Sequence, residues 1–175
     1  MNDQPRSNTR GLDCWRPLLV VAAAIVQDGR LLVVSKTVAP DVFYLPGGKP
    51  ETDEEALETL ARELGEELGV EPLNTRFLAE VEATAALENV PMRMTVFEAQ
   101  INRTPRPAAE LAHLRWIFGR EQDIVLAPAV RDHVLPLLRH RGTLAPTGNS
   151  QPLPRPDEPT RPPHPRPRSA HGRMT

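Results

Sequence analysis

The sequence has a single cysteine and no apolar stretch long enough to cross a membrane. Cys14 has no second cysteine to pair with, which excludes a disulfide within the chain. The longest apolar run covers residues 18–26, whereas a membrane-spanning helix needs about 20 apolar residues. The polar residues 1–13 lack the apolar core of a signal peptide. We therefore expect a cytoplasmic protein without a membrane anchor.

An excess of positive charge is also missing. The formal net charge is -2, which argues against a nucleic-acid polymer as the partner. From residue 146 onward five arginines stand against Asp157 and Glu158, so this segment carries +3 and the remainder of the chain -5. An acidic domain that acts on an acidic phosphate compound needs a cation between the two.

Proline separates a foldable part of the chain from a tail. Nine of the 20 prolines lie in residues 146–175, which contain almost no large apolar side chain. Such a segment cannot offset the entropy of ordering, so we expect a disordered, solvated tail with polyproline II character. A Pro-rich docking ligand or a basic arm is the less favoured interpretation. We assign residues 15–145 to one domain and residues 1–14 to a flexible N-terminal segment.

Alternating strand and turn signals predict a mixed sheet with helices on its faces. Residues 18–26 and 31–35 are expected to form a hairpin, with Asp28-Gly29 as its turn. A short apolar piece ends at Pro46-Gly47-Gly48, where a tight loop begins. Pro128 suits the first turn of a last helix, which Pro136 should kink. Three further strands are predicted over residues 76–84, 92–101 and 113–118.

The clearest predicted element is an amphipathic helix over residues 53–68. Thr52 and Glu55 have capping-box spacing, and Gly69 stands where a helix end favours a residue that tolerates positive φ. One apolar stripe at helical spacing is expected to pack against the sheet. Its members are Leu57, Leu60, Ala61, Leu64 and Leu68.

Three glutamates share one face of this helix. Glu63, Glu66 and Glu67 stand at i, i+3 and i+4, which places them within one arc of about 100°. Like charges at this spacing repel by about 0.2 to 0.5 kcal/mol per pair. A hard divalent cation removes the repulsion, and carboxylate oxygens are the ligands that Mg²⁺ or Mn²⁺ prefers. Taken alone, a solvated acidic face would explain them as well, but here a Gly-Gly turn precedes the helix.

Residues 48–70 resemble the signature box of the Nudix family. They read GKPETDEEALETLARELGEELGV, and they place Gly48, Glu54, Arg62, Glu63, Leu64, Glu66, Glu67, Gly69 and Val70 at the spacings of that box. The approach Leu45-Pro46-Gly47 and the following Lys49 are similar to the usual LPGGK segment. The resemblance implies an α/β fold of the α+β type, an α/β/α sandwich with a mixed β-sheet.

The same resemblance implies hydrolysis of a diphosphate linkage in a nucleotide, assisted by Mg²⁺ or Mn²⁺. Glu63, Glu66 and Glu67 resemble the metal-binding and catalytic cluster, and a backbone carbonyl of the turn, at Gly47, resembles a further metal ligand. One of the three glutamates could instead act as the base. Glu54 and Arg62 resemble the ion pair that braces the loop against the helix, which is also an ordinary structural role.

Other residues are candidates for the base and for substrate binding. Glu110 resembles the loop glutamate that acts as catalytic base in MutT-type members, with Glu98 and Glu88 as weaker competitors. Cationic Lys49 and Arg16 could bind phosphate oxygens together with the backbone at Gly48. Four aromatic residues could stack on a base, although such residues more often belong to a core. They are Trp15, Phe43, Tyr44 and Phe97.

We expect a pyrophosphohydrolase whose substrate is a (deoxy)nucleoside triphosphate, cleaved to nucleoside monophosphate and pyrophosphate. ADP-ribose, another nucleotide sugar or a dinucleoside polyphosphate is an alternative, because the box is shared by all of these classes. An alternative of another kind is a non-catalytic nucleotide-binding sensor, which the intact glutamates disfavour. The partner is thus a small-molecule nucleotide. The compact domain is also compatible with a homodimer, for which the sequence holds no specific signal.

Overall fold

The computed structural model describes residues 16–108 and 110–145. The predicted N-terminal segment 1–14 and the predicted tail 146–175 lie outside the described residues, as does Trp15. The elements in chain order are β1 Leu18–Gln27, β2 Arg30–Lys36, β3 Ala39–Tyr44, β4 Gly47–Gly48, α1 Ala56–Leu68, β5 Pro72–Thr84, β6 Pro91–Ile101, β7 Leu111–Ile117, β8 Val125–Leu126, the π-helical segment η1 Ala129–Val134 and α2 Leu135–His140.

The strands form one mixed sheet in the order β5-β6-β1-β2-β3-β8, with β7 paired to β2 and β4 paired to β1. One edge of β1 runs parallel to β6 along most of its length. Its other edge pairs with β2 only at the C-terminal end, through Val26 and Gln27. The two-residue β4 pairs with the middle of that second edge, opposite Val21 and Ala22. The divergence of β1 and β2 thus leaves a place in the sheet for a loop.

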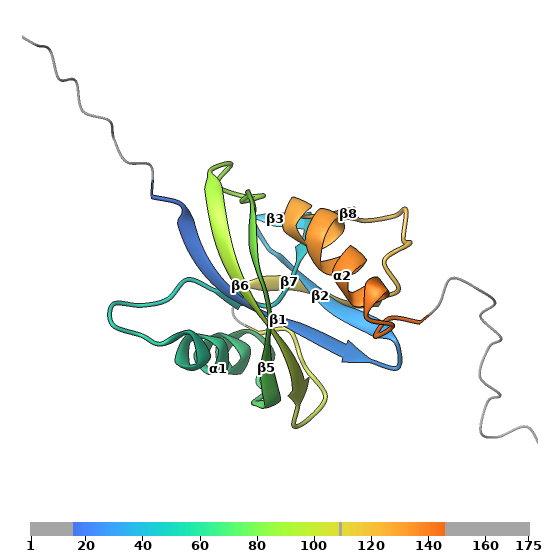
Figure 1. The fold of residues 1–175 in the computed structure, drawn as a ribbon, viewed down its shortest axis with the longest axis horizontal. Helices are drawn as coiled ribbons and strands as arrows, with labels where there is room; N and C mark the ends of the chain where they lie inside the picture. The colour runs from blue at the N-terminus through green and yellow to red at the C-terminus, as the bar shows by residue number, and fades with distance from the viewer. Residues whose placement is uncertain (1–15, 109, 146–175) are drawn as a thin grey trace, which may run out of the picture.

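Helices cover both faces of the sheet, because side chains along β1 alternate between two apolar layers. Val21, Ala23 and Ile25 belong to the buried cluster that contains the leucines of α1. Ala22 and Ala24 belong to the cluster that contains the buried side chains of η1 and α2. Figure 1 shows α1 on one side of the sheet and the C-terminal helices on the other. The predicted α/β/α sandwich of the α+β type is confirmed.

The start of α1 lies three residues later than predicted. Asp53 has a left-handed backbone (φ 64°), so the chain turns there instead of entering the helix. The carboxylate of Glu58 accepts the backbone N–H of Glu55 at 3.0 Å, so the capping pair is Glu55 with Glu58 and the predicted pair with Thr52 is wrong. The predicted end at Gly69 is confirmed, with φ 64°.

The buried side of α1 is rotated relative to the predicted stripe. Leu57 is 53% exposed and Ala61 is exposed as well, so these two predictions are wrong. The buried arc turns away from Ala61 toward Glu67, which is only 3% exposed. The rotation places one of the three glutamates at the edge of the core. Three leucines are fully buried as predicted: Leu60, Leu64 and Leu68.

The predicted hairpin turn is confirmed, and the last helix changes its type beside the proline for which a kink was predicted. Asp28 and Gly29 adopt φ of 50° and 69°, the left-handed pair that a tight hairpin turn needs. The C-terminal helix changes from the π-helical η1 to α2 next to Pro136, which cannot donate a backbone hydrogen bond. Within residues 16–108 and 110–145, no helix combines the length and the apolar character needed to cross a bilayer.

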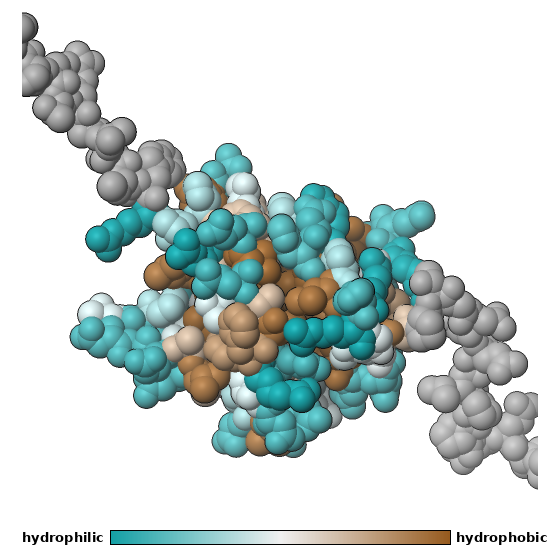
Figure 2. Space-filling view, viewed as in Figure 1, coloured by the Kyte–Doolittle hydropathy of each residue, from teal (hydrophilic) through white to brown (hydrophobic). Residues whose placement is uncertain are grey.

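Apolar residues reach the surface over part of the molecule. Figure 2 shows them gathered across the centre of one face, with hydrophilic residues around them. On β5, an edge strand, Leu73 and Phe77 remain 44% and 62% exposed, and the ring of Phe77 meets that of Phe97 edge-on at 6.2 Å. A left-handed Asn74 accompanies a register shift between Leu73 and Arg76 in this strand, and Arg76 adds an exposed charge. Such features disfavour pairing of an edge strand with another chain.

Candidate active site

The glycine turn before α1 is attached to the middle of the sheet. β4 pairs with β1, and the backbone N–H of Ala23 donates to the carbonyl of Pro46 at 2.9 Å. Neither glycine has room for a side chain as its neighbours stand. A Cβ on Gly47 (φ 137°) would lie 2.2 Å from the carbonyl oxygen of Val21, and a Cβ on Gly48 would lie 2.2 Å from Oε1 of Glu63. The bare backbone therefore contacts β1 on one side and the glutamates of α1 on the other.

Glu54 and Arg62 connect the loop to the helix, as predicted. Arg62 donates from Nε to Glu54 Oε1 at 2.8 Å and from Nη2 to Glu54 Oε2 at 2.9 Å, a two-point contact. The same Nη2 donates to the carbonyl of Lys49 at 3.1 Å, and the hydroxyl of Thr59 donates to Glu54 Oε2 at 2.9 Å. The hydrogen bond from Arg62 lowers the pKa of Glu54 to about 2.

The three glutamates on α1 lie in three different environments. The side chain of Glu66 is 59% exposed, that of Glu63 is 16% exposed and that of Glu67 is 4% exposed. Nη1 of Arg62 lies 2.9 Å from Oε1 of Glu63 and 3.5 Å from Oε2 of Glu66. One guanidinium thus offsets part of the repulsion that the spacing of the glutamates creates.

Glu67 is the buried member of the cluster. Its Oε2 accepts the backbone N–H of Gly47 at 3.0 Å, which ties the helix to the glycine turn. Its Oε1 has no hydrogen-bond partner among the described residues, and Nζ of Lys36 lies 3.9 Å away from it. Burial raises the pKa of Glu67 to about 7, against the lowering effects of Gly47 and Lys36. One buried carboxylate oxygen is therefore available to a ligand.

Lys36 and Glu110 come from strands that lie side by side. Lys36 ends β2, and it pairs with Leu111 at the start of β7, so that Glu110 immediately precedes its partner strand. The two side chains form a hydrogen-bonded ion pair. Although burial alone lowers the pKa of Lys36, the hydrogen bond to Glu110 and the charge of Glu67 raise it above its ordinary value. Lys36 therefore remains a cation between two carboxylates.

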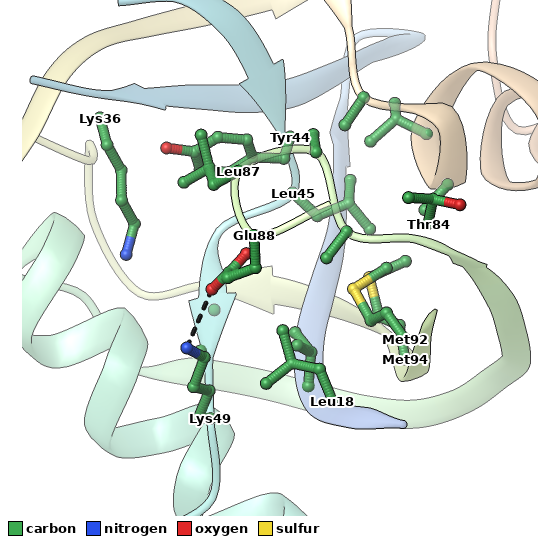
Figure 3. A pocket seen from close by; sticks show the side chains of 18 of the residues that line it. Leu18, Lys36, Tyr44, Leu45, Lys49, Thr84, Leu87, Glu88, Met92 and Met94 are labelled. Atoms are coloured by element: carbon green, nitrogen blue, oxygen red, sulfur yellow. Dashed lines mark ion pairs between the residues drawn. The ribbon is translucent and has the colours of Figure 1, made fainter. Parts of the chain in front are cut away.

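One cavity of about 510 Å³ adjoins the glycine turn, Glu63 and the Lys36–Glu110 pair, whereas Glu66 and Glu67 are not among its lining residues. Its polar side is lined by Lys36, Lys49, Glu63 and Glu110 together with the backbone of the glycine turn. Figure 3 shows Lys36 on one side of the view and two methionines on the other, with an ion pair between Lys49 and Glu88 in the middle. The apolar compartment, as we call the opposite side, includes Leu18, Val20, Met92, Met94, Ala129 and Val130.

This arrangement can be compared with known proteins. A model of the NUDIX domain matches residues 16–134. The chain belongs to the Nudix family. Over 125 residues this Nudix protein is 32% identical to a Mycobacterium tuberculosis protein provisionally named 8-oxo-dGTP diphosphatase 2, and the match covers 69% of this chain and 88% of that protein.

Two further relatives agree with the family assignment. A match of 63 residues to the CTP pyrophosphohydrolase of Escherichia coli is 40% identical and covers 34% of this chain, so it spans about half (47%) of that relative. The crystal structure of a MutT NUDIX hydrolase from Burkholderia pseudomallei is 29% identical with a TM-score of 0.59, and covers 66% of this chain and 94% of its own. These matches place the Nudix chain among hydrolases that act on diphosphate bonds.

The fold gathers most, but not all, of the residues predicted for the site. Lys49, Glu63, Glu110 and both glycines line the cavity. Glu66, Glu67 and Arg16 are not among its lining residues, and Arg16 is exposed. Tyr44 lines it, but Phe43 and Phe97 pack in the two apolar clusters instead. Of the weaker competitors for the base, Glu88 lines the cavity, and Glu98 instead pairs with Arg76 at 3.5 Å.

Lys36 is the site residue that sequence reasoning missed. It ends an apolar strand and belongs to no recognisable spacing, and only the pairing of β2 with β7 brings it to Glu110 and Glu67. A lone lysine after an apolar run is a common strand end, so the sequence offered only a weak signal.

The glutamate cluster does not form a metal site in the arrangement that the structure shows. Among the residues described, no three Asp, Glu, His or Cys side chains form a group that could hold a metal ion. Arg62 binds Glu63, and Gly47 binds Glu67, so the carboxylates are directed to different partners. The donors nevertheless suit a hard divalent cation, because Glu67 keeps a buried oxygen without a partner and Glu66 is accessible.

Replacement of Glu54 by glutamine should make the free energy of unfolding depend less on pH in the acidic range. Because the folded-state pKa of Glu54 lies at about 2, below its ordinary 4.5, its ion pair stabilises the fold above pH 4.5 and is lost as the pH falls toward 2. Urea unfolding should show Glu54→Gln to be less stable than the parent at pH 7, with the difference shrinking below pH 4.5. Glu51→Gln, which removes an exposed carboxylate of the same loop, is the control. A difference between parent and Glu54→Gln that stays constant over this range would contradict the assignment.

Proposed function

We propose that this Nudix protein hydrolyses (deoxy)nucleoside triphosphates to nucleoside monophosphate and pyrophosphate with the help of Mg²⁺ or Mn²⁺. The observation that carries the proposal is a cavity in which carboxylates and lysines adjoin an apolar compartment. A nucleoside triphosphate is divided in a similar way, into a charged phosphate chain and a flat base that can pack its ring faces against apolar side chains. The names of the two sequence relatives refer to nucleoside triphosphates as well.

The lining of the apolar compartment favours a base over a second sugar. Met92 and Met94 offer polarisable thioethers, which pack well against an aromatic ring. Thr84 is the polar side chain that Figure 3 labels beside the methionines, whereas Tyr44, whose hydroxyl also belongs to a lining residue, lies toward Lys36. The hydroxyl groups of a second sugar would therefore lose hydrogen bonds to water without replacement. This supports a triphosphate over ADP-ribose and other nucleotide sugars.

The glutamates would hold the cation that the reaction needs. Glu63, Glu66 and Glu67 would supply carboxylate oxygens, and the carbonyl of Gly47 would complete the donor set. The unpartnered Oε1 of Glu67 and the closeness of Gly48 to Glu63 support this fit. Bound Mg²⁺ or Mn²⁺ neutralises charge on phosphate oxygens and makes a nearby water more acidic.

The side chains around the cluster would carry out the remaining steps. Water forms a bond to one phosphorus of the phosphate chain, and the bridging P–O bond on the opposite side breaks, with its electron pair staying on the leaving phosphate group. Glu110 accepts the proton of that water, and Lys36 holds Glu110 in place through their ion pair. Lys49 and the backbone of Gly48 bind phosphate oxygens, which orients the chain for in-line attack.

A screen of hydrolysis over nucleotide classes tests the proposal. The purified chain is incubated with ribo- and deoxyribonucleoside triphosphates, ADP-ribose, other nucleotide sugars and dinucleoside polyphosphates. Each reaction is run with Mg²⁺, with Mn²⁺ and with a chelator, and the products are separated by anion-exchange chromatography. We expect the highest kcat/KM for a nucleoside triphosphate, release of pyrophosphate rather than orthophosphate, and loss of turnover with the chelator.

The other outcomes separate the rival functions. A higher kcat/KM for a nucleotide sugar or a dinucleoside polyphosphate would show that the same active site acts on another substrate class than the proposed triphosphate. Binding of a nucleotide without turnover under any metal condition would show a sensor and would overturn catalysis altogether. The intact Glu63, Glu66 and Glu67 favour turnover over sensing.

A further inference from the structure

Glu88 lies on a tight turn that borders the cavity. The turn connects β5 to β6, and Leu87 and Glu88 both line the cavity. The backbone N–H of Ala85 donates to the carbonyl of Val90 at 2.9 Å, and the N–H of Asn89 donates to the carbonyl of Ala85 at 3.0 Å. Asn89 takes the left-handed conformation (φ 54°) that closes the turn. The position of the Glu88 side chain is thus set by a hydrogen-bonded backbone.

An ion pair between this turn and the glycine loop bridges the cavity. Nζ of Lys49 lies 2.9 Å from Oε1 of Glu88, and the side chains are 57% and 39% exposed. In Figure 3 the pair stands between Lys36 and the methionines, at the junction of the polar side and the apolar compartment. The hydrogen bond from Lys49 lowers the pKa of Glu88, so Glu88 carries its charge at neutral pH. The lysine beside the glycine turn is therefore occupied by an internal anion.

A substrate phosphate and the carboxylate of Glu88 require the same donor. Lys49 has three N–H groups on one compact charge, and both anions are oxygen acceptors for it. A nucleotide that reaches across the cavity also brings its negative charge close to Glu88, which repels it. An exposed ion pair is weak in water, so exchange of partners by Lys49 is feasible.

We propose that Glu88 is a positioning residue that competes with the substrate for Lys49. In the free protein, Glu88 holds Lys49 across the cavity. When a nucleotide polyphosphate binds, Lys49 leaves Glu88 for a phosphate oxygen, and after hydrolysis Glu88 takes it back. Glu88 thus lowers the affinity of the site for polyphosphates and assists product release. This inference rests on the proposed role of Lys49 in substrate binding.

A double-mutant cycle on Lys49 and Glu88 tests the competition. The set comprises the parent, Glu88→Gln, Lys49→Met and the double variant, each assayed on the best nucleoside triphosphate of the screen. We expect Glu88→Gln to lower KM by about two- to fivefold, the factor that corresponds to an exposed ion pair, with a much smaller change in kcat. Lys49→Met should raise KM, and in that background the Glu88→Gln change should lose most of its effect.

Glu82→Gln is the matched control for the change in net charge. Glu82 lies on β5 near the same end of the strand, pairs with Arg93 at 3.0 Å and does not line the cavity. Its replacement should leave KM unchanged. An equal fall in KM for both glutamine variants would show that the loss of any one negative charge explains the effect, and it would overturn the proposal. An unchanged or higher KM in Glu88→Gln would overturn it directly.

Binding of inorganic triphosphate separates this inference from the proposed function. Isothermal titration calorimetry of the four proteins with inorganic triphosphate in the presence of Mg²⁺ needs no turnover. Tighter binding by Glu88→Gln that depends on Lys49 would support the competition even if the hydrolysis screen failed. Normal triphosphate hydrolysis with no difference in affinity between the parent and Glu88→Gln would leave the proposed function intact and overturn the role of Glu88.

Discussion

Glu67→Gln is expected to lower kcat by at least about a hundredfold, the lower end of what a group in proton transfer or charge stabilisation contributes. The carboxylate of Glu67 presents a buried oxygen without a protein partner. The neutral amide of glutamine at this position would attract a metal cation much less strongly. Glutamine has the same shape and can still accept the N–H of Gly47 through its amide oxygen. The free energy of unfolding at pH 7 should therefore change by no more than about 1 kcal/mol.

The measurement combines steady-state kinetics with urea unfolding of the same preparations. Glu66→Gln should lower kcat in the same direction, because it removes the accessible carboxylate of the cluster. Glu58→Gln is the control on the same helix: it keeps an acceptor for the helix cap and lies in the first turn of α1, apart from the three glutamates of the cluster. Full activity in both Glu66→Gln and Glu67→Gln would exclude the proposed mechanism.

Gly47→Ala should disrupt the attachment of the glycine loop to the sheet. The new Cβ would lie 2.2 Å from the carbonyl oxygen of Val21, and the backbone at φ 137° is one that alanine rarely adopts. Both the backbone of β1 and that of the loop are fixed by hydrogen bonds, so neither yields cheaply. We expect a loss of unfolding free energy on the order of 3 kcal/mol, together with loss of activity.

Gly48→Ala provides the matched comparison for Gly47→Ala. Its Cβ would meet Oε1 of Glu63, which is the end of a flexible side chain. Glu63 can move aside, so the unfolding free energy should fall by less than about 1 kcal/mol. Activity should still fall about tenfold or more, because the displaced carboxylate belongs to the proposed metal-binding cluster. Urea unfolding and kcat measured in parallel check both variants, and equal stability losses would refute the distinction.

The fold and the central part of the site could be predicted because their signals are local. A helix, its left-handed end at Gly69 and the Glu54–Arg62 contact depend on spacings within about 20 residues of chain. The box motif includes both the loop and the helix, so the resemblance to the family predicted both. The predicted start of the helix was wrong, because the left-handed backbone of Asp53 follows from the loop and has no reliable signal in a single sequence.

Contacts between distant strands could not be predicted in the same way. Lys36 meets Glu110 across 74 positions of sequence, and Lys49 meets Glu88 from the opposite side of the cavity. Neither lysine stands at a sequence separation from its glutamate that matches a known motif. The register of β2 with β7 decides the first contact, and the turn between β5 and β6 decides the second.

The sequence by itself determined the box, the helix that carries Glu63, Glu66 and Glu67, and the need for bare glycines before it. Those features arise from helical periodicity and backbone sterics, which act over short stretches of chain. Only the tertiary structure decided which glutamate is buried, which cations accompany the cluster and where an apolar compartment adjoins it. These depend on which side of α1 packs on the sheet and on how β1 and β2 diverge, and both are settled by burial of the whole core.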